Sequence, residues 1–260
     1  YSKYLHFGRK ISAVVALEIN EWNQVTEPQL LIKDLKYTEE DEMHYNYYLS
    51  LYDLFKHTEA MPTDVSIALD IKYKLSAENL LDGRKTLILV HTKTNLINLM
   101  KEIKNHQNLF NKKPKVWYTN NCGSKNQYDI VVNPIIEQID FDGYEKVVLY
   151  DPLWSRSEYD LIKKKVDTLY WVEKSDVIHR DEIKSLIPDR QDFAVLYRHI
   201  KLLESLNIRS VYLDHLLEEC NKAAKMNEFK ILLCMDVFKE LGLMYYNFDH
   251  DHIFFQVLSN

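Results

Sequence analysis

The sequence predicts an α/β protein, and three observations support this fold class. Short apolar strands alternate with helical segments between residues 65 and 185, a pattern typical of a parallel sheet covered by helices. Two strand-like stretches precede this region, and helices replace the strands from residue 186 onward. We therefore expect four parts, which are residues 1–37, 38–64, 65–185 and 186–260.

The first part is predicted to be a β-hairpin. SAVVALEIN (12–20) and PQLLIKDL (28–35) are rich in β-branched and apolar residues, with the turn-forming NQVTE (23–27) between them. If the first strand runs straight to residue 22, alternation separates an aliphatic face from a polar face that carries a tryptophan. The two sets are Val15, Leu17 and Ile19, and Glu18, Asn20 and Trp22.

Residues 38–64 are predicted to form a linker that contains a short ordered element. The segment begins with an acidic run, continues with aromatic residues and ends near Pro62 among turn formers. Its net charge is −6, whereas residues 1–37 carry +1, residues 65–185 carry +2 and residues 186–260 carry −3. Charge alone therefore predicts no strongly basic nucleic-acid surface on any part.

The third part is predicted to form a Rossmann-like three-layer sandwich. NLINLMKEIKN (95–105) is helical, and Ser155 with Glu158 forms a capping box that opens a second helix through Lys165. The basic run at residues 163–165 is then a solvated helix end. The predicted buried strands are TLILV (86–90), KVWYT (115–119), YDIVV (128–132), EKVVLY (145–150) and TLYWV (168–172).

The last part is predicted to be a winged-helix-like helical subdomain. Its helices are DRQDFAVLYRHIKLLES, VYLDHLLEECNKAAK and NEFKILLCMDVFKELG, and the third ends at Gly242 as a C-cap. LMYYNF and HIFFQVL then form a β-hairpin. The third helix is expected to expose a mixture of charges that suits a protein contact better than phosphate. These residues are Glu228, Lys230, Asp236, Lys239 and Glu240.

Composition excludes several classes of protein. The chain is 46% hydrophobic and 28% charged, and no apolar run approaches the ~18 residues of a membrane span, so we expect a cytoplasmic protein with no membrane partner. The five glycines never lie close enough for GxGxxG or a P-loop. The three cysteines, Cys122, Cys220 and Cys234, are far apart and predict reduced, mostly buried thiols.

Two groups of acids have competing interpretations. Asp151 follows a predicted strand, where open α/β sheets place their ligand groups, but a turn acid before Pro152 is the favoured alternative. Asp249, His250, Asp251 and His252 could bind a metal weakly, yet a solvated hairpin turn accounts for them better. We therefore assign no catalytic and no metal-binding residue.

The hairpin segment ALEINEWNQVTEPQLLIKDLK resembles the end of the OB-fold domain of the RecJ family of single-strand-specific 5′-to-3′ DNA exonucleases. A second resemblance lies in DRQDFAVLYRHIKLL and FKILLCMDVFKELGLM, which look like the closing segment of the long, low-GC Gram-positive members. Gln24 replaces a glycine common in the family. The matching hairpin positions are Asn20, Trp22, Asn23, Gln29, Leu30 and Asp34.

The resemblance implies a C-terminal accessory region of an enzyme that acts in DNA repair and recombination. The family holds two divalent metals, usually Mn²⁺ or Mg²⁺, with Asp and His clusters that include Asp-His-His. No Asp-His-His occurs in this chain, so the catalytic core is expected upstream of Tyr1 and the chain alone is expected to be inactive, without a cofactor.

For the chain itself, the first hypothesis is that it helps seat single-stranded DNA. Trp22 would stack on a base, and Arg9, Lys10 and Lys33 would contact phosphates; the alternative for Trp22 is a structural anchor under the turn. The second hypothesis is an adaptor that docks a single-stranded-DNA-binding protein or a helicase. The third is a degenerate nucleotide-binding domain, since the strands faintly resemble a helicase RecA-like domain.

Overall fold

A computed structural model describes residues 11–22, 25–58, 73–75, 80, 82–106, 114–118, 128–151, 153, 155–172, 180–249 and 251–258. The chain divides into two compact units. Residues 1–48 and 188–260 belong to the first unit, and residues 49–187 belong to the second.

The second unit is built on a six-stranded sheet with the order β3-β8-β7-β4-β6-β5, in which every pair of neighbours is parallel. This confirms the predicted α/β class with a parallel sheet. The central strands β4 and β7 are apolar after their first residue because both of their faces are buried. The strands are β3 (Tyr73–Leu75), β4 (Thr86–Val90), β5 (Lys115–Tyr118), β6 (Tyr128–Val132), β7 (Lys146–Leu149) and β8 (Leu169–Val172).

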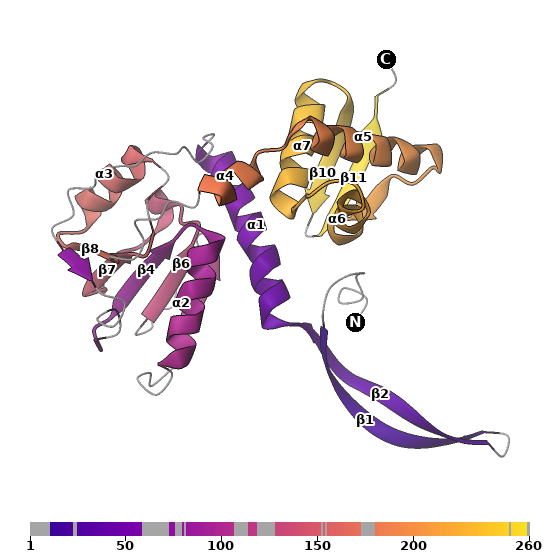
Figure 1. Cartoon of the computed structure of the whole chain (residues 1–260), viewed down its shortest axis with the longest axis horizontal. Helices are drawn as coiled ribbons and strands as arrows, with labels where there is room; N and C mark the ends of the chain where they lie inside the picture. The colour runs from indigo at the N-terminus through magenta and orange to yellow at the C-terminus, as the bar shows by residue number, and fades with distance from the viewer. Residues whose placement is uncertain are drawn as a thin grey trace. The chain divides into compact units, whose positions relative to one another are not determined.

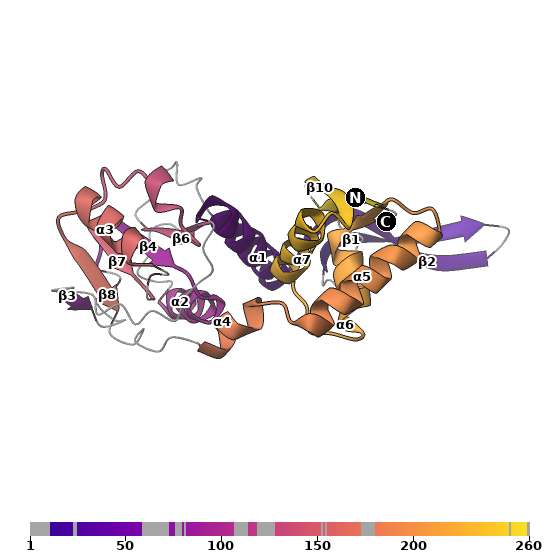
Figure 2. The same ribbon diagram turned by 90° about the horizontal axis from the view of Figure 1, so that it is seen from above.

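Helices cover both faces of this sheet. Figures 1 and 2 show α2 (Lys93–Asn105) and α3 (Arg156–Lys165) on opposite sides of it. Right-handed crossovers require this arrangement, because β4-α2-β5 and β7-α3-β8 run outward in opposite directions along the sheet. Leu87, Leu89 and Leu149 form one buried cluster with Tyr159 and Ile162 of α3. The unit also contains η4 (Ile136–Gln138) and α4 (Arg180–Leu186).

The helix starts in this unit follow local capping rules. The predicted capping box of α3 is present, with the Ser155 hydroxyl accepting from Glu158 N and the Glu158 carboxylate accepting from Ser155 N. Helix α2 begins two residues before the predicted segment, because the Thr92 side chain accepts from the backbone N–H of Asn95 and serves as its N-cap.

Most of the predicted linker is the 20-residue helix α1 (Glu39–Thr58), longer than the short element expected there. The acidic run at residues 39–42 forms its first turn, where negative charge complements the helix dipole. The hydroxyl of Thr38 accepts a hydrogen bond from Asp41 N and donates one to its carboxylate. Tyr47, Leu51 and Leu54 are its buried apolar side chains. The acids therefore mark a helix start.

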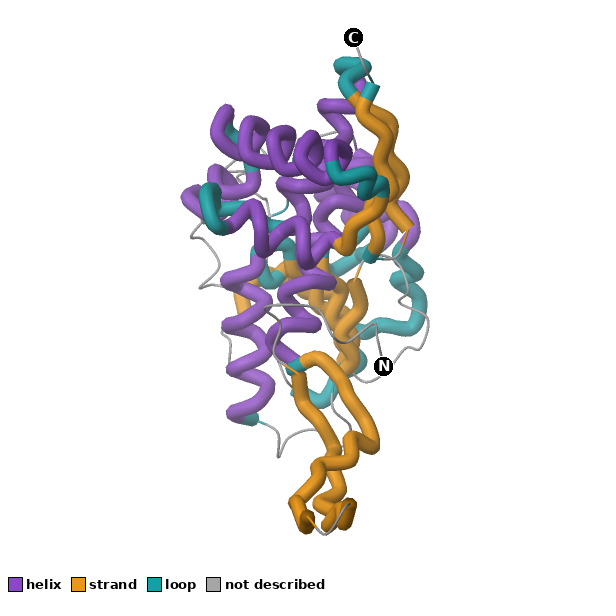
Figure 3. Tube along the Cα trace, turned by 90° about the vertical axis from the view of Figure 1, so that its right-hand side faces the viewer, coloured by secondary structure: helices purple, strands orange, loops and turns teal. Residues whose placement is uncertain are grey.

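The first unit contains the long two-stranded sheet of β1 (Ile11–Trp22) and β2 (Val25–Tyr37). The strands twist around each other in Figures 1 and 3, as two-stranded ribbons do. Val25 to Glu27, predicted to lie in the turn, belong to β2, and the register shifts between Val14 and Val15. Apart from this irregularity the pairing is continuous, so Val15, Leu17 and Ile19 lie on one face of the ribbon.

The C-terminal part of the first unit has three helices and a three-stranded antiparallel sheet in the order β10-β11-β9. The hairpin of β10 and β11 was predicted, whereas β9 was assigned to a helix. The elements are α5 (Arg190–Ser205), β9 (Ser210–Tyr212), α6 (Leu213–Asn221), α7 (Glu228–Glu240), β10 (Met244–Asp249) and β11 (His252–Val257).

Gly242 lies just beyond α7 with φ of +67°, the left-handed conformation that its predicted role as a cap requires.

Candidate functional site

A buried polar cluster lies at the carboxyl end of the central strands, where open α/β sheets bind their ligands. His91 follows β4, Asn133 follows β6 and Asp151 lies just beyond β7. All three side chains are fully buried. Asn133 adopts a positive φ of 49° and donates from its side-chain amide to Ser50 Oγ at 2.9 Å. The sheet topology thus collects these side chains from distant parts of the sequence.

Asp151 is the centre of this cluster. Its carboxylate accepts hydrogen bonds from His91 N at 2.8 Å, Thr92 N at 2.6 Å and Thr92 Oγ1 at 2.9 Å. These contacts join the end of β7 to the start of α2. Asp151 therefore does lie at the ligand-binding edge, but its oxygens bind the protein's own backbone. It lies in a bend before Pro152, as the favoured alternative predicted, and is fully buried.

His91 lies between two carboxylates. Its Nδ1 is 3.4 Å from an Asp151 oxygen and its Nε2 is 3.7 Å from a Glu158 oxygen. Burial alone would lower the pKa of His91, but the carboxylates of Asp151 and Glu158 outweigh it and raise this pKa to about 9. Sequence reasoning missed His91, although it directly follows a buried strand just as Asp151 does.

The His91 imidazolium should make the second unit's stability depend on pH. Because its folded pKa lies above the unfolded value of about 6.5, the stabilisation is complete below that pH and disappears as pH rises through about 9. We expect a loss of up to about 3 kcal/mol across this range. Urea unfolding, followed by tryptophan fluorescence at several pH values, measures it. His91→Gln is the control, and a parallel decline in this variant would contradict the assignment.

The N-terminus of α2 is occupied by a carboxylate from α4. Glu182 accepts from Lys93 N at 2.6 Å and from Thr94 Oγ1 at 2.7 Å, with a longer contact to Thr94 N at 3.4 Å. Free amides at a helix start after a central strand commonly bind phosphate. In this domain Glu182 takes that position, and nothing in the local sequence around residue 182 indicated it.

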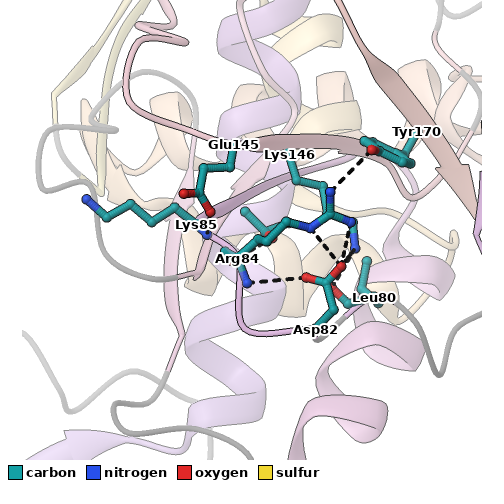
Figure 4. A network of polar contacts seen from close by, with 8 residues as sticks. Leu80, Asp82, Arg84, Lys85, Glu145, Lys146 and Tyr170 are labelled. Atoms are coloured by element: carbon teal, nitrogen blue, oxygen red, sulfur yellow. Dashed lines mark hydrogen bonds and ion pairs between the residues drawn. The ribbon is translucent and has the colours of Figure 1, made fainter.

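A second polar network lies at the opposite, amino end of the strands (Figure 4). Arg84 donates to the Asp82 carboxylate and, at 3.3 Å, to the hydroxyl of Tyr170. The buried Lys146 ammonium donates to Asp82 at 3.2 Å and to the carbonyl of Leu80 at 3.3 Å.

Partial burial opposes ionisation of Asp82, but these hydrogen bonds outweigh it and lower its pKa to about 2. Both cations of the network are thus directed at protein oxygens, and the network ties the segment before β4 to β7 and β8.

Of the predicted nucleic-acid residues, the structure describes Lys33 and the backbone of Trp22. Arg9 and Lys10 lie outside the described residues, as does the side chain of Trp22. The backbone of Trp22 pairs with Val25 at the far end of the hairpin, whereas Lys33 is exposed eight residues further along β2. At ~3.3 Å per residue this separates Lys33 from Trp22 by about 26 Å. One base could not contact both.

The hairpin exposes a continuous aliphatic face. The register pairs Val15 with Ile32 and Leu17 with Leu30, and Ile19 faces a proline across the ribbon. Leu17, Ile19 and Leu30 are 72%, 74% and 63% exposed. Monomeric proteins rarely leave such apolar pairs uncovered. This face is therefore the clearest candidate interaction surface in the hairpin.

Two charged residues of α7 that were predicted to be exposed are buried. Glu228 lies against His44 of α1, with 4.0 Å between the carboxylate and the imidazole. Lys230 forms a 2.6 Å ion pair with Asp192 of α5. The prediction assumed that only the apolar stripe of α7 meets the protein, but other elements cover its first turn as well. Lys239 and Glu240 are exposed, as expected.

The remaining sequence candidates have simple structural roles. Asp249 and His252 pair across the β10–β11 hairpin, next to the turn. Within the part of the chain that the structure describes, no three His, Cys, Asp or Glu side chains are placed to hold a metal ion. His250 and Cys122 fall outside that part. Burial raises the pKa of the Cys220 and Cys234 thiols, which makes them unreactive.

No family model, no curated protein and no solved structure matches the chain. None of the helices in the described ranges combines the length and apolar character needed to cross a bilayer.

Proposed function

We propose that this chain is the C-terminal accessory region of a RecJ-type 5′-to-3′ single-stranded-DNA exonuclease, and that its hairpin helps to seat single-stranded DNA. The exposed aliphatic face of β1 and β2 is the observation that carries this proposal. An isolated two-stranded ribbon is marginal in water and needs further strands or helices against its apolar face. The closing hairpin of an OB barrel has this requirement, because its inner face packs in the barrel core.

The second unit supports an accessory role without nucleotide chemistry. Its parallel sheet with helices on both faces fits a Rossmann-like domain. The amides that a phosphate would use at the start of α2 donate to Glu182 instead. A degenerate nucleotide-binding domain is therefore less well supported than a scaffold.

The C-terminal elements support a winged-helix-like subdomain. Their order, α5-β9-α6-α7-β10-β11, places a short strand between the first two helices and a hairpin after the third. The mixed exposed charges at the end of α7 are a poor match for phosphate. This observation favours the alternative role, in which the chain is an adaptor for a single-stranded-DNA-binding protein or a helicase.

By resemblance, the catalytic Asp and His clusters with their Mn²⁺ or Mg²⁺ ions belong to a region upstream of Tyr1, and the enzyme acts in the cytoplasm in DNA repair and recombination. This chain's contribution is to hold the strand, with Trp22 stacking on a base and Lys33 contacting a phosphate of the same strand further along.

Fluorescence anisotropy of labelled oligo-dT tests the DNA role. We expect salt-sensitive binding that Trp22→Ala weakens about fivefold or more, because stacking contributes ~1–3 kcal/mol per base. Lys33→Ala should weaken binding only of oligonucleotides that reach beyond the ~26 Å between the two positions. Lys163→Ala, at an exposed lysine of α3, is the matched control. Absence of binding at low and moderate salt would favour the adaptor.

A further inference from the structure

The antiparallel sheet of β9, β10 and β11 has one buried and one exposed face. Met244, Ile253 and Phe255 are buried on the face that the helices cover. The other face carries aromatic side chains on all three strands, with exposed fractions of 37% for Tyr212, 61% for Tyr245 and 46% for Phe254. The same face also carries polar side chains, so the rings lie exposed among them; these are Ser210, Asn247, Asp249, His252 and Gln256.

Three rings on this face form a connected strip. His252 lies between Tyr212, at 3.9 Å between ring centroids, and Phe254, at 5.4 Å. The register places Asp249 directly opposite His252 on the neighbouring strand, so a carboxylate borders the strip. We name Tyr212, Tyr245, Asp249, His252 and Phe254 the aromatic face.

The three strands of the aromatic face carry one carboxylate, Asp249, and Arg209 directly precedes β9. None of the three strands, SVY, MYYNFD and HIFFQV, contains a lysine or an arginine. Asp251 follows in the turn between β10 and β11, and residues 186–260 together carry a net charge of −3. Rings of this kind could also stack on nucleobases, but the bordering carboxylates would repel the phosphates of a nucleic acid.

Aromatic rings beside a carboxylate are instead suited to cationic side chains. An arginine or lysine within about 6 Å of a ring is attracted by its electron-rich face, and a nearby carboxylate adds a charge pair. Residues two apart on a strand are ~6.8 Å apart, which equals the spacing of alternate side chains in an extended peptide. In a peptide with a basic residue at every second position, the spacing of the cations would therefore match the spacing of His252 and Phe254 along β11.

We propose that the aromatic face is a docking surface for an extended, arginine- or lysine-bearing segment of a partner protein. The surface lies on elements distinct from the β1–β2 hairpin, so this proposal stands independently of the DNA role. The partner's cations pack on Tyr212 and Phe254 and pair with Asp249, while its backbone lies along the sheet. Tyrosine-rich, partly apolar surfaces of this kind are frequent at protein interfaces.

The test titrates the whole chain against a fluorescent extended peptide with arginine at alternate positions. A citrulline peptide of the same length removes the charge but keeps the shape. We expect the arginine peptide to bind and the citrulline peptide to bind at least several-fold more weakly. Tyr212→Ala and Phe254→Ala should each weaken binding about two- to fivefold, as expected for exposed cation–π contacts. Asp249→Asn should weaken it and reduce its salt dependence.

Leu202→Ala and Glu240→Gln are the controls, since both side chains are exposed on helices away from the aromatic face. They should leave binding unchanged. Equal binding of the arginine and citrulline peptides, or equal losses in the face variants and the controls, would overturn the proposal. Binding of oligo-dT that Phe254→Ala abolishes would also overturn it and would identify the face as a base-stacking platform.

Discussion

Replacement of Asp151 by asparagine is expected to destabilise the second unit by about 3–5 kcal/mol, the range for breaking a buried charge pair. The carboxylate accepts hydrogen bonds from His91 N and from Thr92 N and Oγ1, and it faces the His91 ring. A carboxamide would retain at most part of these contacts and would leave the imidazolium with Glu158 as its remaining carboxylate. Guanidinium unfolding followed by tryptophan fluorescence measures the loss, since Trp117, Trp154 and Trp171 lie in this unit.

Asp160→Asn is the matched control for this change. Asp160 is exposed on α3 and forms a surface pair with Arg156 at 3.2 Å, so its loss should cost less than about 1 kcal/mol. If the Asp151 and Asp160 variants unfold at the same denaturant concentration, then the carboxyl-edge cluster does not stabilise the sheet as described.

Replacement of Lys230 by methionine should have a comparable effect on the C-terminal part of the first unit. The change leaves the buried Asp192 carboxylate without its 2.6 Å ammonium partner, at an expected cost of about 3–5 kcal/mol. Asp192 would keep the backbone N–H of Asp189, which donates at 3.0 Å. Hydrogen exchange of the α5 and α7 amides reports this loss directly, because this part contains no tryptophan.

Two further variants separate charge from packing at this pair. Lys239→Met, at an exposed position in the last turn of α7, should change protection little. Lys230→Met combined with Asp192→Asn should be more stable than Lys230→Met alone, because the double variant leaves no unpaired charge in the interior. A double variant that is no more stable than the single one would show that the unpaired Asp192 carboxylate does not account for the loss.

Five of the six parallel strands could be predicted from sequence almost to the residue, whereas β3 (Tyr73–Leu75) was missed. Runs such as TLILV and YDIVV are mostly apolar because both faces of a central parallel strand are buried, and this pattern is visible locally. The length of the helix at residues 39–58 was underestimated because its acidic first turn has the composition of a linker. In the folded chain the same acids lie in the first turn of the helix, where their negative charge interacts favourably with the helix dipole.

The polar clusters could not be predicted, since their members are distant in sequence. His91 and Asp151 are 60 residues apart, and Lys93 and Glu182 are 89 apart, so only the sheet order brings them together. The buried positions of Glu228 and Lys230 likewise depend on α1 and α5, which the pattern of α7 alone does not encode. Local patterns thus specify the elements, and tertiary pairing specifies the site.

The hydrogen bonds that Glu182 accepts from the start of α2 also bear on how the chain folds during synthesis. Helix α4, which carries Glu182, is the last helix of the second unit to leave the ribosome. Its contacts are nevertheless with the first turn of α2, which is made much earlier. Contacts of such high sequence separation form late and slow the folding of a domain. A nascent chain that stops before residue 182 would therefore carry an α2 whose Lys93 and Thr94 amides lack the Glu182 carboxylate, and the unit would reach its final stability only after its closing helix is made.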